Sequence, residues 1–492
     1  MTEAEFLALQ AAGYNRIPIT LETLADLDTP LSIYLKLANR PGSYLLESVI
    51  GGERFGRYSI VGLPAREMLE VEGRRVRVLR DGAVAEEHDR GDPLAFIDEY
   101  ARRFRAAPLA SGPRFAGGLA GYFSYDVVRY IEPKLGHDAR ADEIGLPPIR
   151  LLLSEELAVV DNLSGKLHLI VYADPAVPGA WEAAQERLQQ LRRKLRDQAP
   201  LPPHADPGPL AAPRSNIGKE AFFAAVARSK RYIFDGDIMQ VQVSQRLSQP
   251  YRGSPLNLYR ALRSINPSPY MFYFDFGDSH VVGASPEILV RREGDQVTLR
   301  PIAGTRKRGA TLERDREMEQ ELVTDPKERA EHLMLIDLGR NDLGRIAKIG
   351  TVKVTETMTV ERYSHVMHMV SNVEGTVDAA LSPMDLLRAT FPAGTVTGTP
   401  KVRSMQIIDE LEPSQRGIYA GAVGYIGFNG NVDLAIAIRT GVVKDGQLHV
   451  QAAAGIVADS LPESEWLETQ NKARALLRAA EMVNEGLDAR ME

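Results

Sequence analysis

Two pairs of glutamates stand three residues apart in segments that read as helices. Glu328 and Glu331 form the first pair, and Glu465 and Glu468 form the second; each follows a proline-containing helix start. At this spacing both carboxylates of a pair lie on one helix face, where like charges cost roughly a few tenths of a kcal/mol. A bound cation removes this cost, and oxygen donors without a thiolate suit a hard ion, Mg²⁺ above all.

Ordinary helix chemistry offers a second interpretation of the same glutamates. Glu328 stands three residues after Asp325, where a capping-box glutamate is typical. Glu468 and Lys472 form an i,i+4 ion pair of the favourable orientation. A di-iron site is less consistent, because the Glu-x-x-His motif of such sites is absent from both segments. The residues by themselves leave the metal site and the capping or surface-pair interpretation open.

Two loops combine residues that suit anion binding. Arg300–Arg306 follows a predicted strand and contains cations, a hydroxyl and a glycine, whose backbone N–H groups can face an anion. Phe391–Lys401 runs into a predicted helix with several hydroxyls and glycines before it. A basic turn and a simple helix cap are the alternatives for these two loops.

The composition excludes several other chemistries. The 492-residue chain contains no cysteine, which rules out disulfides, cysteine-ligated zinc, iron–sulfur clusters and cysteine nucleophiles. A net charge of −7 without a long Lys/Arg block argues against a nucleic-acid partner. No apolar run reaches the roughly 18 residues of a membrane span, and the acidic N-terminus lacks the features of a secretory signal. We therefore expect a cytoplasmic protein that does not cross a membrane.

The elements that must position these residues are of both kinds. Three helices are predicted at about Pro326–Leu338, Lys401–Leu411 and Glu463–Asn484. Strands, among them Tyr270–Phe276 and Val432–Thr440, arrive in antiparallel hairpins rather than in regular alternation with helices. This pattern predicts an α+β fold and not a doubly wound parallel sheet.

A proline-rich segment divides the chain. Six prolines lie between Pro200 and Pro213, and proline disfavours helix at its own position and at the preceding residue, so this stretch should be extended. We therefore expect an N-terminal region at 1–198, a linker at 199–216 and a C-terminal region at 217–492.

A series of short motifs in a fixed order occupies most of the chain after the linker. The motifs are Asp237–Val241, Gly283–Glu287, Pro301–Thr305, Glu331–Met334, Asp337–Asp342, Tyr363–His368 and Gly398–Lys401, and Leu45–Ser48 extends the series toward the N-terminus. The series resembles the chorismate-utilising enzymes, and most closely the anthranilate synthase component I family. The resemblance implies largely antiparallel sheets packed as a sandwich, with helices outside.

The resemblance also implies a reaction. A lyase of this kind converts chorismate and ammonia to anthranilate and pyruvate, in the first committed step of tryptophan biosynthesis. Ammonia adds at C2 of the ring as the C4 hydroxyl leaves, and pyruvate is then eliminated. Glu287 matches the general acid for that hydroxyl, a role that requires a raised pKa at neutral pH. His368 matches a histidine near the same leaving group, with a packed strand histidine as the alternative.

The family's binding residues carry over by position. Mg²⁺ would bridge the ring carboxylate of chorismate to Glu331 and Glu468, with Glu328 and Glu465 beside them. The substrate-binding positions are Gly304, Thr305, Tyr419, Arg439, Gly455 and Lys472; arginine offers a two-pronged contact to the enolpyruvyl carboxylate. The chain departs from the family at Ala453, where a glycine is usual, and a methyl there would tighten or disturb the site.

An inhibitory site for tryptophan is implied as well. Ser48 matches one of its two segments, and Pro269, Tyr270 and Met271 match the other, on opposite sides of the linker. Proline fixes the backbone at Pro269, which suits a rigid recognition edge. An ordinary structural loop beside a buried strand is the alternative.

Two positions separate the possible reactions. Aminodeoxychorismate synthase component I carries a nucleophilic lysine where Ala303 stands, and isochorismate and salicylate synthases carry a water-activating lysine where Gln240 stands. Neither residue here serves as such a group. A non-catalytic metabolite-binding protein on the same fold would be expected to have lost ligand positions, and all are present.

The absent cysteine also bears on the nitrogen source. Glutamine hydrolysis in this family proceeds through a cysteine thioester, and the chain ends at Glu492, shortly after the last predicted helix. We therefore expect a heteromer in which a separate glutamine amidotransferase subunit supplies the ammonia.

Overall fold

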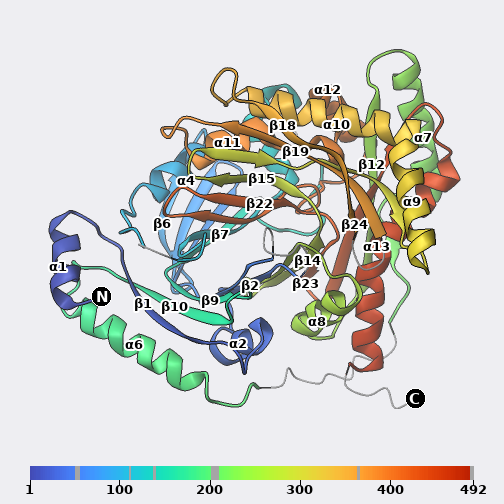
Figure 1. Cartoon of the computed structure of the whole chain (residues 1–492). Coiled ribbons are helices and arrows are strands. Elements are labelled where there is room, and N and C mark those ends of the chain that lie inside the picture. The colour runs from blue at the N-terminus through green and yellow to red at the C-terminus, as the bar shows by residue number, and fades with distance from the viewer. Residues whose placement is uncertain (50–55, 110–111, 137–139, 201–209, 363–365, 488–492) are drawn as a thin grey trace.

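Two large sheets, in which the described strand pairs are antiparallel, form the centre of the protein, and helices cover their outer faces (Figure 1). The computed structural model describes residues 1–49, 56–109, 112–136, 140–200, 210–362 and 366–487. Residues 201–209 of the predicted linker and 363–365 of one motif lie outside this description. The predicted α+β class is confirmed.

The first sheet has twelve strands. In spatial order they are β1 (Ile17–Leu24), β10 (Lys166–Ala173), β9 (Glu156–Asp161), β3 (Tyr58–Gly62), β2 (Ser43–Glu47), β13 (Tyr270–Asp275), β14 (Ser279–Ser285), β23 (Thr440–Lys444), β24 (Gln447–Ile456), β12 (Gln240–Pro250) and β11 (Arg214–Ser215), with β20 (Gly398–Thr399) paired to β12. The pairing of β2 with β13 joins strands from either side of the proline-rich segment.

The second sheet also has twelve strands. They are β17 (Ile302–Lys307), β19 (Val366–Thr376), β16 (Gln296–Leu299), β15 (Ile288–Glu293), β22 (Val432–Ile436), β21 (Ala422–Gly427), β7 (Gly118–Phe123), β8 (Ile149–Ser154), β4 (Glu67–Glu72), β5 (Arg75–Arg80) and β6 (Ala83–Asp89), with β18 (Lys353–Arg362) paired to β19. Here β21 and β7 make the junction across the proline-rich segment.

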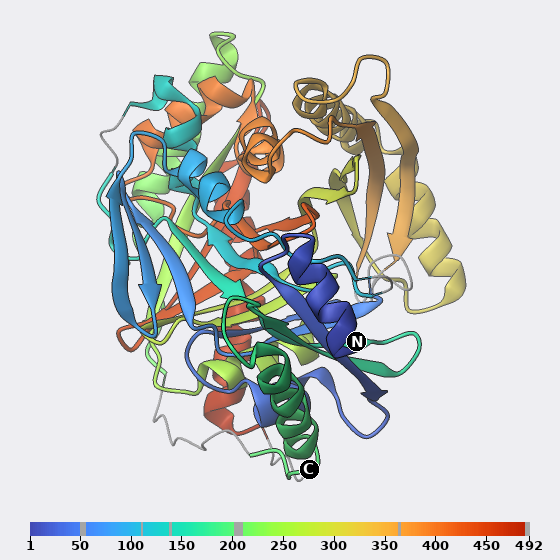
Figure 2. The same cartoon turned by 90° about the vertical axis from the view of Figure 1, so that its left-hand side faces the viewer.

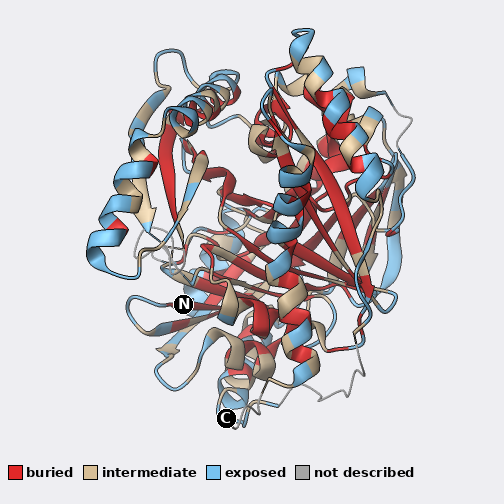
Figure 3. Cartoon of the chain, turned by 90° about the vertical axis from the view of Figure 1, so that its right-hand side faces the viewer, coloured by how far each residue is buried: buried red, intermediate tan, exposed pale blue. Residues whose placement is uncertain are grey.

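Apolar side chains fill three layers. Inward-facing residues of both sheets, such as Tyr44, Phe274 and Val423, form the central layer. The outer face of the first sheet packs against α1 (Glu3–Ala11), α2 (Pro30–Leu37), α6 (Ala180–Lys194), α8 (Pro255–Ile265) and α13 (Pro462–Glu485). The second sheet and β12 pack against α4 (Pro93–Ala101), α7 (Lys219–Phe234), α11 (Pro383–Thr390) and α12 (Lys401–Leu411). In Figure 3 the strands are mostly buried and the helices turn exposed faces outward.

Two further helices complete one edge of the second sheet. α9 (Leu312–Thr324) and α10 (Pro326–Gly344) pack against β17 and β19, and Figure 2 shows this group together at one side of the molecule. The side chain of Asp325 caps α10 by accepting from the backbone N–H of Lys327 and Glu328, and Pro326 occupies the first turn. The short helices are α5 (Val128–Ile131), η1 (Tyr125–Val127), η2 (Pro133–Leu135) and η3 (Gly394–Val396).

The chain crosses from one sheet to the other at two neighbouring points. β14 belongs to the first sheet and β15 to the second, with Pro286 and Glu287 between them; β22 and β23 make the reverse passage through residues 437–439. Hydrogen bonds lock the crossings together, from Ile436 N to Glu287 O at 3.0 Å and from Ala284 N to Arg439 O at 3.1 Å. The predicted single strand Val432–Thr440 is therefore wrong, because Arg439 adopts a φ of 50° and ends the strand pairing.

The predicted helices are confirmed with small changes at their ends. Lys401–Leu411 is as predicted, whereas α10 continues to Gly344 and α13 begins at Pro462. Within the described residues, no helix combines the length and the apolar character that crossing a membrane requires.

Candidate active site

A cleft of about 1080 Å³ opens between the ends of the two sheets and the helices α10 and α13. A pocket of about 200 Å³ adjoins it and shares several wall residues with it, among them Gln240, Arg439 and Lys472. Glu287 and Tyr419 line only the smaller pocket, whereas Glu465 and Glu468 line only the cleft. The site is thus a wide entrance with a small inner chamber, which we call the inner pocket.

Glu287 reaches the inner pocket from the first sheet crossing. It is buried, and burial raises the pKa of its carboxyl from 4.5 to about 8, against the lowering influence of Thr395, Arg439 and Lys472. Arg439, on the second crossing, lines the same pocket, and burial lowers the pKa of its guanidinium while Glu287 counteracts this. The crossings therefore place a carboxyl that is mostly protonated at neutral pH beside an arginine.

His368 lies on β19 and faces the cleft. Its Nδ1 lies 3.1 Å from the carbonyl oxygen of Gly304 and 3.1 Å from Oγ1 of Thr305. A carbonyl only accepts, so Nδ1 carries the proton in that contact. Burial lowers the pKa of His368, which keeps the ring neutral at pH 7.

Gly304 sits where no other residue fits without displacement. Its φ is 66°, and a Cβ atom would lie 2.8 Å from Cδ1 of Leu322 and 3.1 Å from Oε2 of Glu328. Gly455, on β24, is constrained in the same way, because a Cβ there would lie 2.7 Å from Nε2 of Gln240.

Tyr419 and Lys472 meet at the backbone of Ala453. Lys472 Nζ donates to the carbonyl oxygen of Ala453 at 3.0 Å and pairs with Glu468 at 2.6 Å. Tyr419 is buried, and burial raises the pKa of its hydroxyl to about 12. Ala453 itself lines the inner pocket, so its methyl group reduces the space that a glycine would leave.

All four predicted metal-binding glutamates line the cleft. Burial raises the pKa of Glu331, with a further contribution from the charge of Glu328, and Gln240 Nε2 donates to it at 3.4 Å. Burial also raises the pKa of Glu465, to which the charge of Glu468 adds. Among the described residues, no three acidic or histidine side chains come close enough together to hold a metal ion.

Two of these carboxylates form ion pairs with cationic side chains. Arg306 Nη1 donates to Glu328 at 3.1 Å, and Lys472 pairs with Glu468 at 2.6 Å, as the surface-pair interpretation predicted for the latter. Asp325 caps α10, but the Glu328 side chain turns to Arg306 and does not complete a capping box. The surface pair predicted for Glu468 is therefore present, the capping box predicted for Glu328 is not, and both glutamates line the cleft.

The two candidate anion loops have different surroundings. Arg306 contacts Glu321, Asp325 and Glu328, so its charge is matched by neighbouring carboxylates. In the second loop, α12 has no side-chain cap, and Thr395 faces the inner pocket beside Glu287. The loop therefore belongs to the wall of the pocket and does not cap the helix.

Known proteins are similar in sequence to this chain over nearly its whole length. A family model described as chorismate binding enzyme matches residues 67–478. The anthranilate synthase component 1 of Neisseria meningitidis serogroup A is 59% identical over 491 residues, which cover 99% of this chain and 100% of the relative. The protein of the same name from Pseudomonas aeruginosa is 56% identical over 494 residues, with 99% and 100% covered. The crystal structure of anthranilate synthase component I from Streptococcus pneumoniae TIGR4 has a TM-score of 0.77 and 37% identity, and the match covers 92% of this chain and 98% of that one.

The chain belongs to the chorismate-binding enzyme family, among its anthranilate synthase component 1 members. It is accordingly a lyase of the chorismate-utilising class. The resemblance that the sequence motifs carried is confirmed, and so is the sandwich of antiparallel sheets that it implied.

A second hollow in this chorismate-binding enzyme lies between the sheets and involves the predicted inhibitor residues. Ser48, Pro269, Tyr270 and Met271 all line a pocket of about 70 Å³. A wider hollow of about 430 Å³ adjoins it and shares Ser48 among its wall residues.

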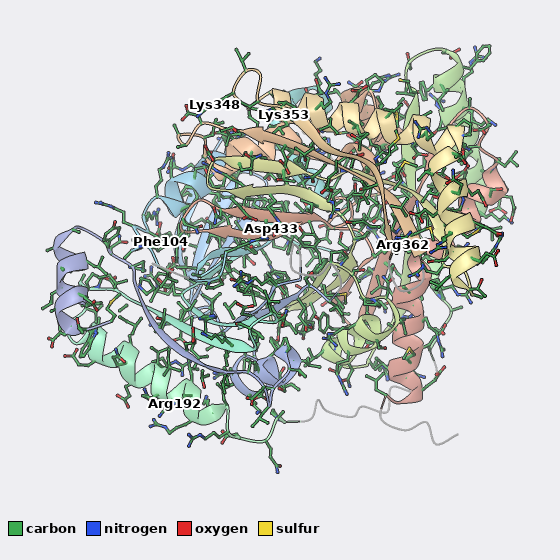
Figure 4. All side chains as sticks on the ribbon, viewed as in Figure 1. Phe104, Arg192, Lys348, Lys353, Arg362 and Asp433 are labelled. Carbon is green, nitrogen blue, oxygen red and sulfur yellow. The ribbon has the colours of Figure 1, made fainter. Side chains whose placement is uncertain are left out.

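The pocket of about 70 Å³, which we call the Ser48 pocket, has buried charged residues among its lining. Arg291 Nε donates to Asp433 at 3.0 Å, and the Tyr270 hydroxyl donates to the same carboxylate at 2.9 Å. Figure 4 shows Asp433 near the middle of the molecule, far from Arg362 at the end of β18. Glu47 also lines this pocket, and its carboxylate is bound by Tyr259 and Arg263.

Several wall residues were not predicted as site residues. Thr395, Gln242 and Gln451 line the inner pocket, and Glu47, Arg291 and Asp433 line the Ser48 pocket. Thr395 belongs to the candidate anion-binding loop Phe391–Lys401, and Gln242 directly follows the motif Asp237–Val241, so these segments were the available signals. Glu47 belongs to the quoted segment Leu45–Ser48, so that segment was the available signal.

The raised pKa of Glu287 makes a prediction about stability. The folded protein holds this proton up to about pH 8, whereas a glutamate in the unfolded chain loses it near its ordinary pKa of 4.5, so stability falls as pH rises between these values. Glu287→Gln should therefore be more stable than the original protein at pH 9, by at least about 1 kcal/mol, and nearly equal to it at pH 4. Urea denaturation at both pH values measures the difference.

The control is Glu293→Gln, at the exposed end of β15, the strand that begins directly after Glu287. It should not change the pH dependence. A Glu287→Gln variant whose stability relative to the original protein is equal at pH 4 and pH 9 would show that the carboxyl ionises normally.

Proposed function

We propose that the chain is the chorismate-converting component of an anthranilate synthase, which forms anthranilate and pyruvate from chorismate and ammonia. The observation that carries the proposal is the buried, protonated carboxyl of Glu287 beside Arg439, at the closed end of a cleft bordered by glutamates. Support comes from the 59% identity over 491 residues to a relative named anthranilate synthase component 1.

Glu287 acts as the general acid. Ammonia bonds to C2 of the ring, the C4–oxygen bond breaks, and Glu287 gives its proton to the departing hydroxyl, which leaves as water. A carboxyl with a pKa of about 8 still holds this proton at neutral pH, and burial of the site excludes water that would compete as a donor. Pyruvate is eliminated in the following step.

The other pocket residues orient the substrate. His368, neutral and with its Nδ1 proton directed at Gly304, presents Nε2 as an acceptor and orients the leaving hydroxyl without protonating it. Arg439 and Tyr419 hold the enolpyruvyl carboxylate, and Gly304, Thr305, Gly455 and Lys472 complete the wall. Arginine suits this role because its guanidinium binds a carboxylate at two points.

Mg²⁺ fits the glutamates by the chemistry of the donors. Glu328, Glu331, Glu465 and Glu468 supply only oxygen, and their mutual repulsion contributes to the raised pKa of Glu331 and Glu465. When bound, the ion would neutralise the ring carboxylate of chorismate and fix it at the cleft wall. Glu331 and Glu468 are the proposed direct ligands, and Lys472 would exchange its contact with Glu468 for the substrate.

The inner pocket argues against the alternative reactions. Ala303 lines it and has no amino group to attack the ring, as aminodeoxychorismate synthase component I would require. Gln240 donates to Glu331 and cannot activate water as a base. Ammonia is left as the nucleophile that adds at C2, and anthranilate as the product.

The proposed metal site predicts the behaviour of Glu331→Gln. Turnover that depends on Mg²⁺ should fall about 100-fold or more, because a neutral amide is a poor ligand for a hard ion. Thermal stability without metal should hold or rise, since a repulsive buried charge is removed. Mg²⁺ titration of activity and calorimetric Mg²⁺ binding measure the two effects. Asp337→Asn, exposed on the same helix, is the control, and retained Mg²⁺ dependence in Glu331→Gln would refute the assignment.

The nitrogen source follows from the cysteine count. With no cysteine, the chain cannot form the thioester through which glutamine is hydrolysed, so a separate glutamine amidotransferase subunit must supply ammonia. The purified chain should form anthranilate from ammonium and chorismate but none from glutamine. Its rate with ammonium should rise between about pH 7 and 8 as free ammonia increases, and flatten above that as Glu287 ionises. Sustained anthranilate formation from glutamine by the chain alone would contradict this prediction.

We also propose that tryptophan inhibits the enzyme at the pocket of Ser48 and Tyr270. This pocket joins the N-terminal region, proposed at 1–198, to the C-terminal region at 217–492, so a ligand there would favour one arrangement of the two by its differential affinity. Its ring would meet the apolar wall residues Phe115 and Phe272, which belong to the same central layer.

The inhibitor proposal is tested by Ser48→Phe. A phenyl ring should fill the small pocket and raise the tryptophan concentration for half inhibition at least tenfold, with the uninhibited rate kept within about twofold. Ser164→Phe, in an exposed turn, is the control. Unchanged inhibition in Ser48→Phe would place the tryptophan site elsewhere.

A further inference from the structure

A buried arginine–glutamate pair lies beside the inner pocket without lining it. Arg416 is 2% exposed and Glu412 is 4% exposed, and Nη2 of the arginine lies 2.7 Å from Oε1 of the glutamate. Neither side chain is part of the wall of the cleft or of the inner pocket. Two charges removed from water in this way add little stability compared with a well-packed apolar pair, so their other contacts require an explanation.

The remaining donors of Arg416 go to the backbone of the pocket wall. Nη1 donates to the carbonyl oxygen of Val396 at 2.7 Å, and Nη2 donates to that of Gln242 at 2.8 Å. The guanidinium also lies over the ring of Tyr419, 5.6 Å from its centroid. Val396, Gln242 and Tyr419 come from three separate segments, and all three line the inner pocket.

Glu412 is linked through Ser244 to a fourth wall residue, Gln451. The backbone N–H and the hydroxyl of Ser244 both donate to its Oε1 at 2.8 Å. The same hydroxyl accepts from Nε2 of Gln451 at 2.8 Å, and Gln451 lines the inner pocket. The ion pair therefore joins β12, β24, the η3 segment and the loop of Tyr419 through short, directed contacts.

The η3 segment links this network to the acid. Val396, which Arg416 holds, directly follows Thr395, and Thr395 lines the inner pocket together with Glu287. Displacement of this segment would move Thr395 relative to Glu287 and remove its lowering influence on the pKa of that carboxyl. The hydrogen bond from Arg416 to Val396 thus acts on Glu287 through one neighbouring residue, Thr395.

We infer that Arg416 and Glu412 are positioning residues that hold Thr395 against Glu287 and Tyr419 against the bound substrate. This inference deepens the proposed function and rests on it. It differs from a purely structural role, in which the pair would stabilise the fold and leave the pocket geometry to other contacts.

The chain offers a matched control in the pair of Arg150 and Glu70. Both are buried, at 6% and 5% exposure, and Arg150 Nε donates to Glu70 Oε1 at 2.8 Å. The other donors of Arg150 go to Asp278 and Ser279, which line neither the cleft nor the inner pocket. Loss of this pair tests what the loss of a buried ion pair does to the fold.

The experiment compares two double variants with the original chain. Arg416→Met with Glu412→Leu removes both charges at once, which spares the fold the cost of one unpaired buried charge. Arg150→Met with Glu70→Leu is the control. Arg416→Lys is a further variant that keeps the charge but cannot bind Glu412 and two carbonyls together, because lysine lacks the planar fork. Each is assayed with chorismate, Mg²⁺ and ammonium across pH 6–10.

A positioning role predicts a specific loss. The Arg416/Glu412 double variant should lose at least tenfold in kcat, and the pH at which its activity declines should move upward from about 8. Arg416→Lys should show a smaller change of the same kind. The control should keep its kcat within about twofold and its pH profile unchanged. A pocket variant with unaltered kcat and pH profile, or a control with the same losses, would overturn the inference.

A crystal structure of the Arg416/Glu412 double variant tests the inference without an activity assay. Residues 394–397 and the ring of Tyr419 should shift relative to Glu287, and unchanged positions would overturn the positioning role. Failure of the original chain to form anthranilate would instead overturn the proposed function, and the structural comparison would still decide the role of the pair.

Discussion

A carboxyl group remains protonated at neutral pH only where water does not reach it, and this condition sets the design of the inner pocket. Glu287 meets it because the chain passes from one sheet to the other at that residue, so its side chain lies between two packed layers. The second crossing lies alongside and brings Arg439 to the same place. The antiparallel pairs on both sides of the crossings, β14 with β23 and β15 with β22, fix the two backbones relative to each other.

Much of the architecture could be predicted from local patterns. The helix at Lys401–Leu411 and the glutamate-bearing helices follow from apolar spacing and from proline at their first turns, and the hairpins follow from their turn residues. The interruption at Arg439 could not be predicted in this way. Residues 434–438 form an uninterrupted apolar run between Asp433 and Arg439, and the strand breaks there because β22 and β23 pair in different sheets.

The site residues also differ in whether local sequence patterns predict them. Glutamates at i,i+3 and a lysine four residues on carry a signal in the sequence, because helix geometry alone places them on one face. Arg416 and Thr395 have no such spacing signal in the sequence. Their importance comes from backbone carbonyls and a carboxyl that distant segments bring to them, at sequence separations of 20 residues for Val396 and 174 for Gln242. The family motifs identified the walls of the pocket, and three-dimensional packing was needed to find what holds the walls in place.

The carboxylates of the inner pocket and of the open cleft have different surroundings. At the closed end, desolvation dominates, and Glu287 is kept neutral as a proton donor. At the open end, Glu328 and Glu468 have cationic neighbours in Arg306 and Lys472, so their charge is compensated in place. A dianionic substrate needs both conditions at once: a cation where its ring carboxylate lies and an uncharged acid where its hydroxyl leaves. In the proposed reaction, a Glu287 as accessible as Glu468 would ionise at pH 7 and would repel the substrate that it is proposed to protonate. The proposed division between binding carboxylates and one reacting carboxyl therefore depends on the depth of each in one continuous hollow.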